Sequence, residues 1–394
     1  MGSRDGGGPA GVRGALRAPS PASRRGGAIP GGSGPLNAPG PLLPGGRVFL
    51  TGGSGLVGSH VAEVLRREGH PVRAFHRRGS DVGHLRELGC ELLEGALPAG
   101  EPALAAATRG CEAVVHAAAL IYTDLSWPRV RAVNVEGSAN VFRAAAAAGV
   151  RRAVFLSSVA AYGDPAPSVD ERTPLDGRLH PWERYARSKR EGERVISEIA
   201  GPAGMAVAVL RPSAIYGERD RLFTPKIASA LRFPIHPMLG GGRTPMSAVY
   251  AGNVAAAVLA GLRGPLPVGT RAYNVADDYG LSQRELYSGL ARELGVPFRP
   301  VSLPRVLVQM GASLGVALGM RIPGAEELPL RRAAHLAIHS NPYLSERIRE
   351  ELGWSPAVPS EEALRRTAAW IARIWGAGGN VRFKPVSIPP EPTP

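Results

Sequence analysis

Residues 47–58 read RVFLTGGSGLVG, in which a glycine-rich turn follows a short apolar stretch. The stretch Arg47–Leu50 has the β-branched and aromatic content of a strand. After the turn, apolar residues over Ser59–Glu68 recur at helical spacing, and Gly69 ends that helix. The sequence therefore predicts a strand, a tight glycine turn and a helix in direct succession.

The glycine turn has the chemistry of a dinucleotide site. The backbone N–H groups of such a turn can approach a pyrophosphate at the N-terminus of the following helix, where the helix dipole favours anions. A strand before the turn and a helix after it favour this interpretation over a glycine-rich turn without a ligand. The residues predicted to contact the dinucleotide are Gly52, Gly55, Leu56, Val57 and Gly58.

On both sides of this turn, short β-rich runs alternate with helical stretches, which predicts parallel strands joined by crossover helices. The predicted fold class is α/β, a doubly wound parallel sheet of the Rossmann type with a smaller, interleaved C-terminal substrate lobe. Further strands are predicted at Val72–His76, Glu112–Ala117, Ala153–Ser157 and Ala206–Arg211, and helices at Asn134–Ala148 and Tyr185–Ile199.

Composition divides the chain into four parts. Residues 1–45 form a Gly, Pro and Arg-rich leader predicted to be disordered, residues 46–215 form the dinucleotide-binding domain, and residues 376–394 form a loose tail. Residues 216–375 are predicted to be mainly a substrate-binding lobe that partly returns to the sheet. The helical windows of this lobe are Pro225–Leu231, Asn253–Leu262, Gln283–Leu294 and Glu361–Ile374.

Charge and cysteine usage favour a reducing cytoplasm as the location of the chain. The 394 residues carry 47 Lys and Arg against 33 Asp and Glu, but this excess is scattered and predicts no nucleic-acid partner. No uncharged apolar stretch reaches the roughly 18 residues of a membrane-spanning helix. The two cysteines, Cys90 and Cys111, have no zinc or CxxC spacing, so no metal site is predicted.

The type of dinucleotide depends on the residues after the second predicted strand. An acidic residue there would bind a free ribose hydroxyl, yet the sequence reads His76, Arg77 and Arg78. Guanidinium groups suit a ribose 2′-phosphate because they form paired, charge-assisted hydrogen bonds. NADP is therefore the predicted cofactor, with NAD as the alternative.

Tyr185 and Lys189 are four residues apart and so lie on one face of a predicted helix. A phenol with a pKa of about 10 is a poor proton carrier at neutral pH, and a neighbouring ammonium lowers that pKa. Tyr185 could then exchange a proton with an alcohol or ketone oxygen while hydride moves to or from a nicotinamide. Ser158, at a predicted strand end, could hydrogen-bond the same oxygen. Alone, a Tyr–Lys pair at this spacing is more often ordinary helix surface.

Further motifs follow the glycine turn along the chain. They are HAAA at 116–119, LSSVAAYG at 156–163, YARSK at 185–189 and RPSAIYG at 211–217. With these motifs in this order, roughly residues 46–375 resemble the extended short-chain dehydrogenase/reductase family. The resemblance implies that Tyr185 is the general acid/base, that Lys189 lowers its pKa and holds the nicotinamide ribose, and that Ser158 polarises the reacting oxygen. Further cofactor contacts are implied for Ala117, Ala118, Ala119, Pro212 and Ser213.

Three further positions refine this picture. The family usually has an Asp after the third strand that contacts adenine, whereas this chain has Ala96, so that contact is expected to be missing. His116 could serve as a base in isolation, but the resemblance makes it a structural residue at a strand end. Of the two neighbouring serines, the resemblance assigns catalysis to Ser158 rather than Ser157.

The substrate is predicted only by class. The sequence from Tyr216 is similar to the branch of 3β-hydroxysteroid dehydrogenases and dihydroflavonol-type reductases, which favours a lipophilic secondary alcohol or ketone. One alternative is a nucleotide-sugar epimerase or dehydratase, and another is a non-catalytic dinucleotide-sensing protein. The apolar stretch Val306–Met320 is predicted to be a buried or interfacial helix; a cover over a lipophilic substrate and contact with a membrane surface are the other interpretations. The resemblance also leaves room for a homodimer.

Overall fold

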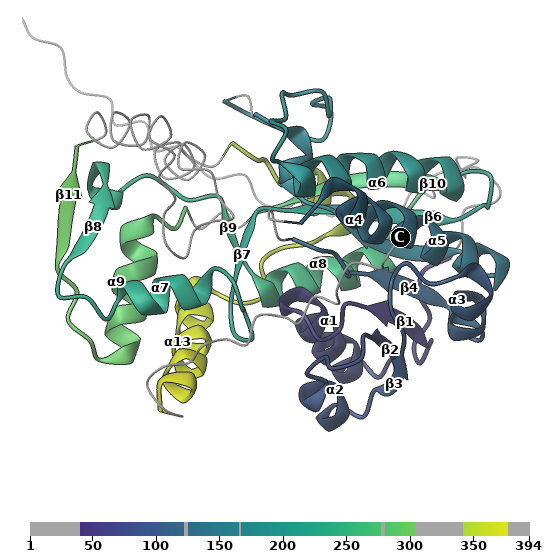
Figure 1. The fold of residues 1–394 in the computed structure, drawn as a ribbon, viewed down its shortest axis with the longest axis horizontal. Coiled ribbons are helices and arrows are strands. Elements are labelled where there is room, and N and C mark those ends of the chain that lie inside the picture. The colour runs from purple at the N-terminus through teal and green to yellow at the C-terminus, as the bar shows by residue number, and fades with distance from the viewer. Residues whose placement is uncertain (1–39, 122–124, 165–166, 277–279, 305–341, 377–394) are drawn as a thin grey trace, which may run out of the picture. The chain divides into compact units, whose positions relative to one another are not determined.

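The structure is a computed structural model that describes residues 40–121, 125–164, 167–276, 280–304 and 342–376. Its main feature is a seven-stranded sheet in the order β10-β6-β5-β4-β1-β2-β3, in which every neighbouring pair is parallel (Figure 1). The predicted doubly wound parallel sheet is therefore confirmed. The strands are β1 (Val48–Thr51), β2 (Val72–His76), β3 (Glu91–Glu94), β4 (Ala113–His116), β5 (Arg152–Leu156), β6 (Ala206–Pro212) and β10 (Gly269–Val275).

Strands β1, β4, β5 and β6 are buried along their whole length. Parallel strands that are covered on both faces are apolar at nearly every position, and their alternate residues enter opposite layers. In β1, Val48 and Leu50 belong to one apolar cluster with Leu210, whereas Phe49 belongs to a second cluster with Phe155. The sheet is therefore the middle of three layers.

Helices form the two outer layers. On one face, α1 (Leu56–Arg67) packs against α8 (Ala251–Arg263), and on the other, α3 (Glu101–Thr108), α5 (Gly137–Ala147) and α6 (Arg184–Ala200) pack side by side (Figure 1). Shorter elements connect them: α2 (Gly83–Glu87), α4 (Trp127–Arg131), a π-helical turn at Ala132–Glu136 and a 3₁₀ turn at Val159–Tyr162.

Several segments after β6 form a smaller group of elements with its own apolar cluster. Two short parallel pairs join β7 to β9 and β8 to β11. Residues such as Ile227, Leu290 and Leu364 fill the cluster between the helices. The elements are β7 (Ala214–Tyr216), β8 (His236–Leu239), β9 (Ala248–Tyr250), β11 (Pro300–Leu303), α7 (Thr224–Ala230), α9 (Gln283–Leu294), α13 (Ser360–Gly376) and a 3₁₀ turn at Gly240–Gly242. Helix α12 (Glu346–Leu352) instead packs against β10 and α8.

Two differences from the sequence expectations concern the sheet and one of its covering helices. Strand β10 was not predicted, because Gly269, Thr270 and Arg271 lack the apolar pattern of a buried strand; β10 lies at the sheet edge, where its first half is only partly buried. The helix predicted from Asn134 begins with the π-helical turn rather than an α-helical one.

Other expectations lie outside the described residues. They concern residues 1–39 of the leader, the tail from residue 377 and the apolar stretch Val306–Met320. Within the parts of the chain that the structure does describe, no helix is long and apolar enough to cross a membrane.

Candidate active site

The turn between β1 and α1 requires glycine at two positions. Gly52 has a φ of +73°, and a Cβ atom there would lie 2.6 Å from the backbone nitrogen of Ala118. A Cβ atom on Gly58 would lie 2.1 Å from the carbonyl oxygen of Gly52. Gly55, by contrast, is exposed and precedes the first turn of α1 without a capping side chain. The turn is therefore tight on its inner side and open where the helix begins.

The segment after β4 lies against this turn. The backbone N–H groups of Ala117 and Ala118 donate to the carbonyl and hydroxyl oxygens of Thr51, at 3.2 and 3.3 Å. Ala119 follows, and all three alanines are partly exposed. The structure thus brings the predicted contacts from β1 and β4 together at the carboxyl ends of neighbouring strands.

His116, the last residue of β4, is fully buried. Its two ring nitrogens form hydrogen bonds with Thr51 Oγ1 at 2.7 Å and Ser138 Oγ at 2.8 Å. Burial, together with the nearby charge of Lys189, lowers the pKa of His116 to about 3. The ring is therefore neutral and structural, in agreement with the sequence analysis.

The end of β2 carries the two predicted phosphate-binding arginines. Arg78 is 91% exposed and forms an ion pair with Glu94 at 2.9 Å. Arg77 is partly buried, and the described residues contain no ion-pair partner for its guanidinium. Because an exposed ion pair contributes little to stability, Arg78 can exchange Glu94 for an anionic ligand at small cost.

Ser158, Tyr185 and Lys189 meet at the carboxyl end of β5. Ser158 follows β5, and its hydroxyl accepts a hydrogen bond from the backbone of Ala160 at 3.1 Å. Tyr185 and Lys189 lie one turn apart on α6, and the Ser158 hydroxyl is near enough to Tyr185 to lower the pKa of its phenol. Lys189 Nζ lies over the Tyr185 ring, 5.7 Å from its centroid. The structure therefore assembles the three predicted residues in one place.

The electrostatics of this trio differ from the expectation. Burial raises the pKa of Tyr185 to about 12, and the nearby Ser158 hydroxyl only partly offsets this rise. Burial also lowers the pKa of Lys189 to about 8, against the opposing effect of Glu193. The predicted lowering of the tyrosine pKa by Lys189 is not found, since the ammonium lies over the ring and donates to the backbone of Leu156. At neutral pH Tyr185 is a protonated phenol, which suits a proton donor.

Pro212 and Ser213 lie beside the trio in the order of the sheet, since β6 pairs with β5. Both residues are buried, and the backbone of Ser213 donates to Val275 at 3.0 Å. Ser213 Oγ is buried and has no hydrogen-bond partner among the described residues. A buried hydroxyl without a hydrogen-bond partner costs folding free energy unless a bound ligand supplies that partner.

The site fits a nicotinamide dinucleotide on three counts. The glycine turn leaves no room for side chains on its inner side, the first turn of α1 has no capping side chain, and Ser213 offers a free hydroxyl. The turn and helix would hold the pyrophosphate, and Ser213 would lie at the nicotinamide end.

Asn134 is a structural element of the site that the sequence analysis missed. It lies in the π-helical turn, where its amide nitrogen donates to Ser188 Oγ at 2.9 Å. Its amide oxygen and nitrogen also pair with the backbone of Leu120, at 2.7 and 2.8 Å. Ser188 in turn donates to the backbone of Tyr185. Asn134 thereby fixes the start of α6. In the sequence, the feature that could have indicated this role is a polar amide at the start of an alanine-rich helix.

The sheet carries a glycine turn suited to a pyrophosphate and a Ser–Tyr–Lys trio at its strand ends. This combination defines a nicotinamide-dependent oxidoreductase. The chain belongs to the NAD dependent epimerase/dehydratase family, whose sequence profile matches residues 48–276. It is therefore an enzyme that transfers hydride between a nicotinamide and a hydroxyl- or keto-bearing small molecule.

Two curated relatives show its similarity to reductases and dehydrogenases. The chain is 30% identical over 322 residues to a 4-hydroxy-2-methyl-3-oxo-4-farnesyl-3,4-dihydroquinoline-1-oxide ketoreductase from Stigmatella aurantiaca, which covers 81% of this chain and 94% of the relative. It is 28% identical over 337 residues to a 3-beta-hydroxysteroid dehydrogenase from Mycolicibacterium neoaurum, with 81% and 89% covered.

Among solved structures, the chain is similar to UDP-glucose 4-epimerase from Thermotoga maritima. The two share a TM-score of 0.64 and 22% sequence identity over 83% of this chain and 99% of that one. At this identity the likeness concerns the fold.

Proposed function

We propose that the enzyme interconverts a lipophilic ketone and its secondary alcohol, with Ser158, Tyr185 and Lys189 as its catalytic residues. The observation that carries this proposal is the convergence of Ser158, Tyr185 and the buried ammonium of Lys189, whose Nζ lies 5.7 Å from the centroid of the Tyr185 ring. Two hydroxyl groups from α6 and the end of β5 can meet one substrate oxygen there.

The roles of the three residues follow from their protonation. When bound, the nicotinamide supplies or accepts hydride at the reacting carbon. Tyr185, a protonated phenol at neutral pH, donates its proton to the carbonyl oxygen during reduction. Ser158 donates a hydrogen bond to the same oxygen, and Lys189 binds the nicotinamide ribose with its remaining donors. In the oxidation direction the alcohol proton passes to the oxygen of Tyr185.

The cofactor contacts form the second part of the proposal. The turn and the start of α1 bind the pyrophosphate through Gly52, Gly55, Leu56, Val57 and Gly58. Ala117, Ala118 and Ala119 line the dinucleotide beside β4, and Pro212 and Ser213 contact the nicotinamide. Residues 46–215 then supply most of the dinucleotide site, and residues 216–375 most of the substrate site.

We further propose that NADP(H) is preferred over NAD(H). The exposed guanidinium of Arg78 and the neighbouring Arg77 support this preference. The test is the ratio of kcat/KM for NADPH to that for NADH in the wild type and in Arg77→Ala/Arg78→Ala. We expect NADPH to be favoured and the double variant to lose that advantage roughly 10-fold or more. A wild-type preference for NADH would reject the proposal.

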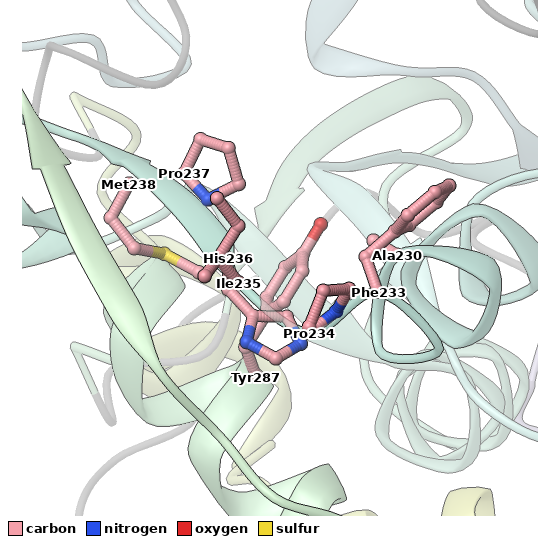
Figure 2. A pocket seen from close by; sticks show the side chains of 8 residues that line it. All are labelled: Ala230, Phe233, Pro234, Ile235, His236, Pro237, Met238 and Tyr287. Atoms are coloured by element: carbon pink, nitrogen blue, oxygen red, sulfur yellow. The ribbon is translucent and has the colours of Figure 1, made fainter.

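The curated relatives support a lipophilic substrate, and the elements after β6 contain an apolar cavity whose lining does not include the trio. The cavity has a volume of about 440 Å³ and lies between the end of α7, β8 and α9 (Figure 2). Its lining includes Phe233, Ile235, Met238 and Tyr287. The farnesylated and steroidal compounds in the names of the two curated relatives are also lipophilic.

The second candidate function is a nucleotide-sugar epimerase or dehydratase. It is favoured by the family assignment and by the fold shared with UDP-glucose 4-epimerase. An epimerase would use Tyr185 and Lys189 with a cofactor that is oxidised and reduced within one cycle. Net turnover of nicotinamide separates the two functions.

The experiment is a panel of steroids, terpenoid and aromatic ketones and nucleotide sugars, followed by nicotinamide absorbance. We expect net oxidation of NADPH with a lipophilic ketone, and its loss in Tyr185→Phe, which should bind NADPH almost as well as the wild type. Sugar isomerisation without net absorbance change would instead support the epimerase. Undiminished turnover in Tyr185→Phe would reject the assigned role.

A further inference from the structure

A buried ion pair lies directly behind the Ser–Tyr–Lys trio. The guanidinium of Arg211 donates from Nε to Glu193 Oε1 at 3.0 Å and from Nη2 to Glu193 Oε2 at 2.6 Å. The two side chains are only 7% and 8% exposed. Because buried charges are costly unless they are paired and hydrogen-bonded, this two-point geometry holds both groups firmly in place.

The pair continues into hydrogen bonds on both sides. Ser157 Oγ donates to the carboxylate of Glu193. Arg211 Nη1 donates to Tyr162 Oη at 2.7 Å, and Tyr162 Oη donates to Asn274 Oδ1 at 2.9 Å. The network therefore joins β5, α6, β6 and β10 through buried polar side chains.

Three members of the network lie within one helical turn of proposed site residues in the chain. Ser157 precedes Ser158, Arg211 precedes Pro212, and Glu193 follows Lys189 by one turn of α6. A helical residue four positions away lies on the same face. The ion pair therefore connects the three segments whose relative placement decides the geometry of the trio.

We propose that Glu193 and Arg211 are positioning residues for the reaction, which hold the strand ends of Ser158 and Pro212 at a fixed distance from the helix face of Lys189. This inference rests on the proposed function. Neither residue reaches the reacting atoms, since both act through the segments that they join. Displacements on the order of 1 Å at such a site cost about 100-fold in rate.

The carboxylate of Glu193 also acts on the charge of Lys189. Burial lowers the pKa of Lys189 to about 8, and Glu193 opposes this by stabilising the ammonium. The other titratable groups around Lys189 are Tyr185 on the same helix, the neutral His116 on β4, and Arg211 on β6 behind Glu193. Loss of the carboxylate therefore moves the pKa of Lys189 further down.

Lysine NMR tests this effect without a substrate. The chain contains only three lysines, Lys189, Lys226 and Lys384, so a ¹³Cε-lysine-labelled enzyme gives three signals that Lys189→Arg assigns. In Glu193→Gln we expect the pKa of Lys189 to fall by about one unit. The control is Glu198→Gln, which changes an exposed carboxylate on the same helix that pairs with Arg194. An unchanged pKa in Glu193→Gln would overturn the proposal.

Kinetics provide the second readout. In Glu193→Gln we expect kcat to fall by roughly 10- to 100-fold with little change in the KM for the cofactor, and the alkaline limb of the pH profile to move to lower pH. Glu198→Gln should match the wild type in both respects. A rate loss without movement of the limb would show a merely structural role. If Tyr185→Phe retains turnover, the proposed function fails instead, and the NMR result still decides the effect on Lys189.

A double variant tests the proposal even if Glu193→Gln does not fold. Glu193→Gln leaves the buried Arg211 without its full partner, which can prevent folding, whereas Glu193→Leu/Arg211→Met removes both charges and keeps the volume similar. We expect this variant to fold and to show the same fall in the pKa of Lys189 and in kcat. A folded double variant with wild-type values for both would refute the positioning role.

Discussion

Lys189 Nζ donates a hydrogen bond to the carbonyl oxygen of Leu156 at 2.5 Å, which links α6 to the last residue of β5. Leu156 precedes Ser158 by two residues, so the bond ties the ammonium to the strand that carries the proposed catalytic serine. Lys189 is only 3% exposed, and burial of an ammonium opposes folding. This arrangement costs stability and is explained by the proposed chemistry.

Replacement of this lysine should separate stability from activity. Burial lowers the pKa of Lys189 from 10.5 to about 8, so the unfolded chain holds more protons between these values and stability rises with pH across that window. Below pH 8 the full cost of burial applies. Lys189→Met should therefore gain roughly 1–3 kcal/mol of unfolding free energy at pH 7, by urea denaturation, while kcat falls roughly 100-fold or more.

The matched control is Lys226→Met, which removes an exposed lysine on α7. We expect it to change neither the urea midpoint nor kcat. A destabilised Lys189→Met would mean that the hydrogen bond to Leu156 outweighs the desolvation of the ammonium.

Ser158→Ala should weaken proton transfer. The Ser158 hydroxyl lowers the pKa of Tyr185, so its loss raises that pKa further and removes one donor to the substrate oxygen. We expect kcat to fall roughly 10- to 100-fold. Ser158→Thr, which keeps the hydroxyl, should recover part of the rate, and Ser288→Ala on α9 should have no effect. Full activity in Ser158→Ala would assign the substrate oxygen to other donors.

Two glycine substitutions should have different effects. A Cβ atom on Gly58 would lie 2.1 Å from a backbone oxygen, so Gly58→Ala should destabilise the fold by about 1–3 kcal/mol. Gly55 is exposed, and its Cβ atom would meet the same oxygen at 3.3 Å. Gly55→Ala should therefore keep a similar melting temperature but weaken NADPH binding, as measured by fluorescence titration. Equal melting temperatures and affinities for the two variants would contradict the geometry of the turn.

Acid should destabilise the enzyme through His116. Burial lowers its pKa to about 3, whereas the unfolded histidine titrates near 6.5, so the unfolded state binds the extra proton between these values. Stability is fully present above pH 6.5 and falls as the pH drops towards 3. At pH 5 the loss from this residue is about 2 kcal/mol relative to pH 7. In His116→Gln, urea denaturation at the two pH values should show a smaller difference; an unchanged difference would reject the assignment.

Many strands and helices could be predicted because their sequence patterns are local. The apolar run of Val72–His76 coincides with β2, and the amphipathic window Gln283–Leu294 coincides with α9. Helix α9 also begins with a capping box between Ser282 and Glu285. Strand β10 could not be predicted in the same way, since its first half is polar and only partly buried.

The candidate site shows the same division. The spacing of Tyr185 and Lys189 predicted their shared helix face, and the structure places Ser158 against them. The pairing of Glu193 with Arg211 and the raised pKa of Tyr185 depend on burial, which no short motif encodes. The sequence could therefore indicate the reacting groups but not their surroundings.

The position of β10 limits how segments can be exchanged between this enzyme and its relatives. Strand β10 covers the edge of β6, and α8 packs on β5 and β6, yet both follow α7 in the chain. A fragment that ended at residue 215 would expose the backbone of β6 and the apolar surface beneath α8, which invites aggregation. Exchange of substrate specificity between relatives therefore requires at least two crossover points, so that donor segments are inserted around α8 and β10 rather than joined at one boundary.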